Sequence, residues 1–80
     1  MILTREIIKA NGFEDSDFGD YYEKKEESGT IRIYENNGYV IEVVSPEGSS
    51  TIRTSSVERI NVLLSFHKIH NKITIANGND

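Results

Sequence analysis

Two histidines, His67 and His70, have the clearest metal-binding chemistry in the sequence. A spacing of three can place two imidazoles near one metal on a helix, but a stable site needs a third and a fourth ligand and groups that orient them. The helix that carries His67 is expected to end between the two residues, and no further ligand set lies nearby. We therefore expect two exposed histidines that suit a helix C-terminus when protonated, and neither a metal nor a cofactor.

Carboxylates gather in the stretch Glu14–Glu27, which we call the acidic region. A calcium loop would need acids at alternating positions, a central glycine and a glutamate at the twelfth, and Asp15-x-Asp17-x-Gly19 fits this pattern only partly. A paired-carboxylate catalytic site and a mimic of nucleic-acid charge are the other functional interpretations. The plain interpretation is a solvated surface. Charge mimicry is the best of the functional ones because it needs only such a surface.

Nucleophilic catalysis has little support in the sequence. The serines do not form a Gly-x-Ser-x-Gly elbow, and the six glycines are scattered through the chain rather than gathered in a phosphate-binding loop. We therefore expect a protein that is not an enzyme.

Composition narrows the class of protein further. Eighty residues predict one domain, residues 1–76, followed by a disordered tail, residues 77–80. The net charge of −4 argues against nucleic-acid binding through a general basic surface. The chain has no cysteine and no long apolar segment, so we expect a cytoplasmic protein without a membrane span.

The stretch Thr30–Val44 predicts a β-hairpin around which the rest of the chain is organised. Apolar and polar residues alternate on both sides of Asn36-Asn37-Gly38, which is the strand pattern. A three-residue loop is favoured because it keeps the apolar residues on one face, whereas a two-residue Asn37-Gly38 turn would pair Ile33 with Glu42 and mix charge into both faces. The predicted pairs are Ile31 with Val43, Arg32 with Glu42 and Ile33 with Ile41.

One helix is predicted before the first strand of the chain and another after the fourth strand. Residues 4–11 read as a helix capped by Thr4, and a second helix begins at Ser55, which with Glu58 would form a capping box, and ends near His67-Lys68. Asp20–Lys24, Ser50–Thr54 and Lys72–Ile75 read as further strands, and Glu14–Gly19 as a polar connection. The predicted fold is α+β, in the order α-β-β-β-β-α-β, with two short helices on one face of an antiparallel meander.

The opening, Leu3-Thr4-Arg5-Glu6-Ile7-Ile8-Lys9-Ala10-Asn11-Gly12-Phe13, resembles that of a group of small uncharacterised proteins encoded by gut Bacteroidetes and their phages and other mobile elements. The likeness continues at Asp20-Tyr21-Tyr22, at Asn37–Glu42 and at the closing stretch Ser56–Ile75. A histidine and a Cys-Gly stop typical of that group are replaced by Glu58 and His67-Lys68, so a lysine has to take the left-handed cap. The resemblance implies a small α+β domain and a mobile-element origin, and no activity.

The function expected from these features is binding of an unidentified protein partner. The candidate surface is the sheet face away from the helices: Arg32, Tyr34, Val40, Glu42 and Val44. The Val62/Phe66 side of the second helix is an alternative surface, and a homodimer is an alternative assembly. The runner-up function is a mobile-element inhibitor whose acidic region blocks a nucleic-acid enzyme.

Overall fold

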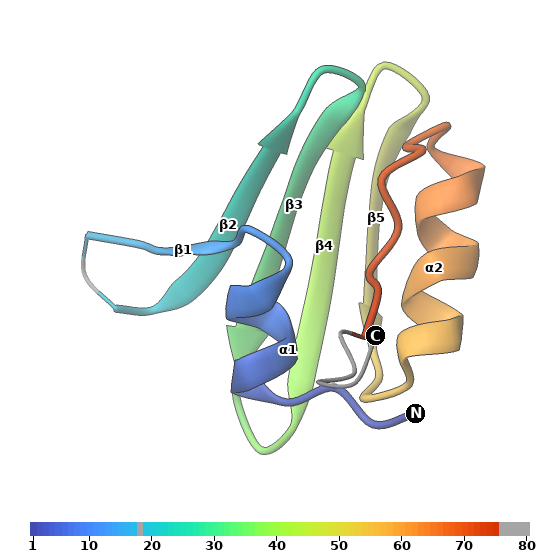
Figure 1. Ribbon diagram of the computed structural model, residues 1–80. Coiled ribbons are helices and arrows are strands. Elements are labelled where there is room, and N and C mark those ends of the chain that lie inside the picture. The colour runs from blue at the N-terminus through green and yellow to red at the C-terminus, as the bar shows by residue number, and fades with distance from the viewer. Residues whose placement is uncertain (18, 76–80) are drawn as a thin grey trace.

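The computed structural model describes residues 1–17 and 19–75, which fold into two helices and five strands. In chain order these are α1 (Arg5–Ala10), β1 (Glu14–Asp15), β2 (Tyr21–Glu26), β3 (Gly29–Glu35), β4 (Tyr39–Ser45), β5 (Gly48–Arg53) and α2 (Val57–Phe66). The strands form one antiparallel sheet in which each strand pairs with the next. Both helices cover one face, here called the inner face, and leave the outer face open (Figure 1). The predicted small α+β domain with an antiparallel meander is confirmed.

The structure corrects the strand content at two places. Glu14 and Asp15, predicted as part of a polar connection, form the edge strand β1 opposite β2. Residues 72–75, predicted as a strand, do not join the sheet. This C-terminal segment runs over the inner face between α1 and α2 (Figure 1). The position buries Ile73 against the core.

Two asparagine side chains hold the C-terminal segment where a neighbouring strand would otherwise do so. The Asn61 amide accepts a hydrogen bond from the Ile73 N–H at 2.8 Å and donates one to the Ile73 carbonyl at 2.9 Å. Asn11 makes the same two bonds with Thr74, at 2.9 and 2.8 Å. A side-chain amide offers a donor and an acceptor side by side, so each asparagine satisfies backbone groups that the sheet leaves unpaired.

The hairpin of β3 and β4 has the predicted loop and the predicted register. The Asn36 N–H donates to the Gly38 carbonyl at 2.9 Å, and Asn37 and Gly38 both have positive φ, at 52° and 114°. Asparagine and glycine tolerate this conformation best, which explains the loop sequence. The three predicted pairs are present: Ile31 with Val43, Arg32 with Glu42 and Ile33 with Ile41.

The core is one cluster of apolar side chains between the inner face and the elements that cover it. Tyr22, across from Ile33, and Tyr39 pack at its margin, so Tyr22 is the inward member of the Tyr21-Tyr22 pair. The buried members are Leu3, Ile8, Phe13, Ile31, Ile33, Ile41, Val43, Val57, Ile60, Leu64, Ile69 and Ile73.

Helix α1 begins and ends at the predicted residues. The Thr4 hydroxyl accepts the Ile7 N–H at 3.2 Å, which is an N-cap. Gly12 has φ 86°, and the Phe13 N–H reaches the Ile8 carbonyl at 3.4 Å. This Schellman ending turns the chain back so that Phe13 enters the core.

Helix α2 begins one residue later than predicted. Ser56, and not Ser55, is the N-cap, and its hydroxyl accepts the Arg59 N–H at 3.2 Å. Ser55 instead binds the N-terminal segment that precedes α1, since its carbonyl accepts the Leu3 N–H at 2.8 Å. The Glu58 carboxylate, released from the predicted capping box, binds the terminal ammonium of Met1 at 2.9 Å, which lowers the pKa of Glu58.

Helix α2 ends on a lysine in the left-handed conformation, as the resemblance implies. Lys68 has φ 59°, and the Ile69 N–H closes a Schellman ending on the Leu64 carbonyl at 2.9 Å. A residue with a Cβ is strained there by about 1 kcal/mol relative to glycine.

Replacing Lys68 with glycine is therefore expected to raise the free energy of unfolding by about 1 kcal/mol. The lost ion pair with Glu47 is long, at 3.8 Å, and exposed, so it offsets little. Urea denaturation measures the change. Lys68→Ala is the matched control, because it removes the same charge and keeps the strain. An equal gain in both variants would show that the charge, and not the backbone, is responsible.

Two sequence predictions concern the ends and location of the chain. The predicted disordered tail, residues 77–80, lies outside the described residues. In the described part of the chain, no helix has the length and apolar character needed to cross a membrane.

Candidate functional site

The five residues predicted to bind a partner lie together on the outer face of β3 and β4. Arg32 is opposite Glu42, and Tyr34 is opposite Val40. Val44 lies toward the Pro46–Glu47 turn and is 39% exposed. The structure therefore places them on one surface, where Arg32 and Tyr34 both bind Glu42.

Arg32 is the centre of a hydrogen-bonded network on this outer face. Its guanidinium binds Glu23 of β2 at 2.8 Å and Glu42 of β4 at 3.3 Å, and these bonds raise the pKa of Arg32. The Tyr34 hydroxyl donates to Glu42 at 3.2 Å, and its ring lies 5.2 Å from that of Tyr21. Partial burial, followed by the Glu42 charge, raises the pKa of Tyr34. Much of the polar capacity of this face is satisfied internally, which leaves little for a partner.

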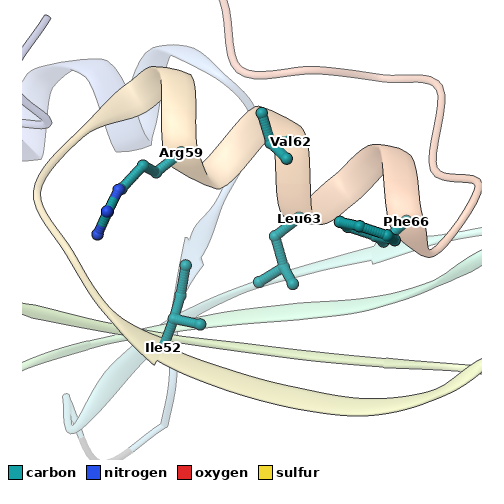
Figure 2. Close-up of a pocket in the computed structure, with 5 residues that line it drawn as sticks. All are labelled: Ile52, Arg59, Val62, Leu63 and Phe66. Carbon is teal, nitrogen blue, oxygen red and sulfur yellow. The ribbon is translucent and has the colours of Figure 1, made fainter.

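An apolar groove of about 290 Å³ lies between β5 and the flank of α2 (Figure 2). In Figure 2 Ile52 and Leu63 point toward each other, with Arg59 extending at one end and Phe66 at the other. Phe66 is 74% exposed and Val62 is 59% exposed, so this surface carries apolar area that the core does not use. The groove is lined by Ile52, Arg59, Val62, Leu63 and Phe66.

Strand β5 borders this groove with a free backbone edge. The Thr54 N–H donates to the Tyr39 carbonyl at 3.0 Å, which continues the β4–β5 ladder. Bonded and non-bonded pairs alternate along an antiparallel ladder, so the N–H and C=O groups of Ser49, Thr51 and Arg53 point away from β4. These outward groups have no backbone partner within residues 1–17 and 19–75.

The two edges of the sheet differ in how they are protected. At the opposite edge β1 has only two residues, both acidic, and β2 beyond it carries Lys24, Lys25 and Glu26. Short strands and charged side chains are the usual protection of an edge against another strand. Strand β5, Gly-Ser-Ser-Thr-Ile-Arg, has neither proline nor lysine, and its one charge lies at the end. The free edge of β5 is therefore the one open to a further strand.

The acidic region surrounds a second, polar hollow of about 210 Å³ at the β1–β2 end of the molecule. Lys9 pairs with Asp15 at 3.3 Å, and Glu23 is held by Arg32. The hollow is lined by Glu14, Asp15, Ser16, Asp17, Tyr21 and Glu23. Across the described residues, no three His, Cys, Asp or Glu side chains are grouped in a way that could hold a metal ion.

The prediction that His67 is exposed is wrong. It is 5% exposed, with Nδ1 at 2.6 Å from the Ser45 hydroxyl and Nε2 at 2.9 Å from the Ser50 hydroxyl. The Schellman ending of α2 turns this residue toward the sheet, between the two arms of the β4–β5 hairpin. His70 is exposed, so the two histidines do not converge. A hydroxyl can donate or accept, so both ring nitrogens are satisfied and the site is structural.

Sequence reasoning found part of the groove and missed the rest. It identified Val62 and Phe66 as surplus apolar surface, but it did not identify Ile52, Leu63 or the edge of β5. A signal is present in α2: Arg59, Leu63 and Phe66 are spaced i, i+4, i+7, a second stripe beside the buried one.

Comparison with known proteins found no relative of this chain. The chain matches no family model, no curated protein and no solved structure.

Proposed function

We propose that this protein is a non-enzymatic binding module that takes an extended protein segment into the groove between β5 and α2. The observation that carries the proposal is the free edge of β5, which lies beside unburied apolar side chains of α2. In strand addition, backbone hydrogen bonds supply affinity and neighbouring pockets select side chains. The cysteine-free chain suits the reducing cytoplasm as the place of this activity.

The groove favours a particular kind of segment. Leu63, Phe66 and Ile52 offer apolar contacts, and Arg59 pairs with no carboxylate among the described residues. A segment with an apolar residue facing the groove and one acidic residue at the Arg59 end therefore complements the groove.

A library of displayed random peptides tests this proposal, followed by titration of the selected peptides into isotopically labelled protein. We expect amide shifts concentrated at Ser49, Thr51 and Arg53 and along α2. Phe66→Ser with Val62→Ser is expected to weaken binding at least about tenfold, because the two exposed apolar contacts are removed. Both side chains are exposed, so folding is expected to be unaffected.

The matched control is Tyr34→Ala with Val40→Ser on the outer face. Under the proposal these changes leave peptide affinity within about twofold. Loss of binding in this control, together with amide shifts on β3, would instead make the outer face the binding surface.

A second candidate function rests on the hollow in the acidic region. Four carboxylates line it, from Glu14, Asp15, Asp17 and Glu23, and such a surface complements the basic site of a nucleic-acid enzyme. Salt separates the two candidates, because exposed charge contacts weaken steeply with ionic strength and apolar strand addition does not. A partner lost in high salt and kept by the Phe66→Ser/Val62→Ser variant would favour the inhibitor.

A further inference from the structure

We propose that the segment bound in the groove is β5 of a second copy of this chain, so that two sheets join edge to edge about a two-fold axis. The inference rests on the proposed function and names its partner. A two-fold interface brings the same patch of both copies together, so the patch must complement itself. The β5–α2 surface meets this condition in its backbone, its charges and its apolar side chains.

The backbone of β5 complements itself in one antiparallel register. With Thr51 opposite Thr51 of the second copy, Ser49 lies opposite Arg53 and Arg53 opposite Ser49. The outward N–H and C=O groups of these three residues then face one another in hydrogen-bonded pairs. No arginine lies opposite an arginine, and the side chains that meet on the outer face are hydroxyls and one guanidinium from each copy.

The charges at the two ends of β5 are opposite in sign. Arg53 closes one end of the strand, and Glu47 lies in the turn before the other. Within one copy Glu47 pairs with Lys68 at 3.8 Å, and Arg53 donates to the Asn36 carbonyl at 2.7 Å. Antiparallel pairing brings Glu47 of one copy close to Arg53 of the second copy, where the two side chains can exchange these contacts for each other, and the two-fold axis repeats the contact. Opposite charges in these positions favour the antiparallel register over a parallel one.

The apolar stripe of α2 supplies the rest of the contact. Helix α2 runs along the same edge (Figure 1). The two-fold axis therefore also relates the two α2 helices, which run in opposite directions. Leu63 lies at the middle of the stripe, near the axis, and Arg59 of one copy faces Phe66 of the other. A guanidinium over an aromatic ring is a favourable contact. Strand pairing is a narrow contact, and this stripe extends it toward the roughly 800 Å² per partner of a stable interface.

Sedimentation equilibrium of the full chain, from micromolar to millimolar concentration, tests the inference. We expect a mass that rises toward twice 9.1 kDa with concentration. Thr51→Pro removes an outward N–H that β4 does not use, so the fold is retained while strand pairing is blocked. Phe66→Glu attacks the same contact from the helix without touching the core. Circular dichroism verifies that both variants fold, and both are expected to be monomers.

A charge exchange tests the register. Glu47→Arg and Arg53→Glu are each expected to weaken self-association by about tenfold, since each places like charges side by side twice. An equimolar mixture of the two variants restores both contacts and forms the mixed dimer, with the affinity of the original chain.

The outcomes separate this inference from the proposed function. A monomer at all concentrations, with peptides still binding the groove, overturns the second copy and leaves the binding module intact. A dimer that Thr51→Pro and Phe66→Glu leave unchanged also overturns the inference, because it would use another surface. A dimer dissociated by groove-binding peptides supports both.

Discussion

Asn61→Ala is expected to lower the free energy of unfolding by about 2–3 kcal/mol. The substitution removes two hydrogen bonds to Ile73 and leaves its N–H and C=O groups without partners at a residue that is 5% exposed. An unsatisfied buried polar group costs more than the net gain of the bond it has lost. Urea denaturation measures the change, and hydrogen exchange locates it. The Ile73 amide is expected to lose its protection before the amides of β3 and β4 do.

Asn71→Ala is the matched control for this prediction. Asn71 also donates from its amide, to the Glu26 carboxylate at 2.7 Å, but the contact is exposed. Its loss is expected to cost less than about 0.5 kcal/mol, because water replaces the bond. Similar losses in Asn61→Ala and Asn71→Ala would contradict the proposed role of Asn61 in holding the C-terminal segment.

His67→Ala is expected to cost about 3 kcal/mol. The imidazole fills the space between the end of α2 and the β4–β5 hairpin, and it satisfies the hydroxyls of Ser45 and Ser50. Alanine leaves a cavity and removes both bonds. Thermal and urea denaturation both report the loss, and solution NMR is expected to show that α2 frays from its C-terminal end.

His70→Ala controls for the removal of a histidine from the same stretch of chain, and the exposed side chain predicts almost no change. His67→Phe separates volume from bonding, since phenylalanine fills the space but makes neither hydrogen bond, and the Ser50 hydroxyl loses its partner. Adding Ser50→Ala to His67→Phe is expected to recover part of the loss. A fully stable His67→Phe single variant would show that the bonds contribute nothing.

The local parts of the fold could be predicted from the sequence. The hairpin register followed from alternation and loop length, because a slip would have exchanged the two faces of both strands at once. The Thr4 cap was assigned correctly because a cap depends on neighbours within a few residues, and the left-handed Lys68 was expected from the resemblance. The start of α2 was wrong by one position, because two adjacent serines are equivalent caps until the Leu3 bond to Ser55 decides between them.

Contacts between distant parts of the chain could not be predicted in this way. Residues 72–75 alternate like a strand, and alternation does not distinguish pairing with a strand from pairing with asparagine side chains. Asn61 and Asn11 look like ordinary polar positions of two helices, 12 and 63 residues away from their partners. His67 follows the last turn of α2, and only the register of the β4–β5 hairpin brings serines to both sides of its ring.

The residue types of the candidate site could be predicted, but their arrangement in space could not. Surplus apolar residues on α2 indicated a surface, but a groove requires knowing which strand lies beside the helix. The five residues predicted for the outer face all lie on it. Its network with Glu23 was missed, because the sequence left open which of Tyr21 and Tyr22 faces inward and therefore which residues of β2 face outward.

The asparagine bonds to the C-terminal segment also bear on the order of folding. Each strand of the meander pairs with its neighbour across a short turn, so the sheet can form through small loop closures. The bond from Asn11 to Thr74 spans 63 residues and can form only once the sheet has brought both ends of the chain to one face. Such non-local contacts are entropically costly early in folding. The C-terminal segment is thus expected to dock last and to open first, as a separate unit of local unfolding over an otherwise intact sheet.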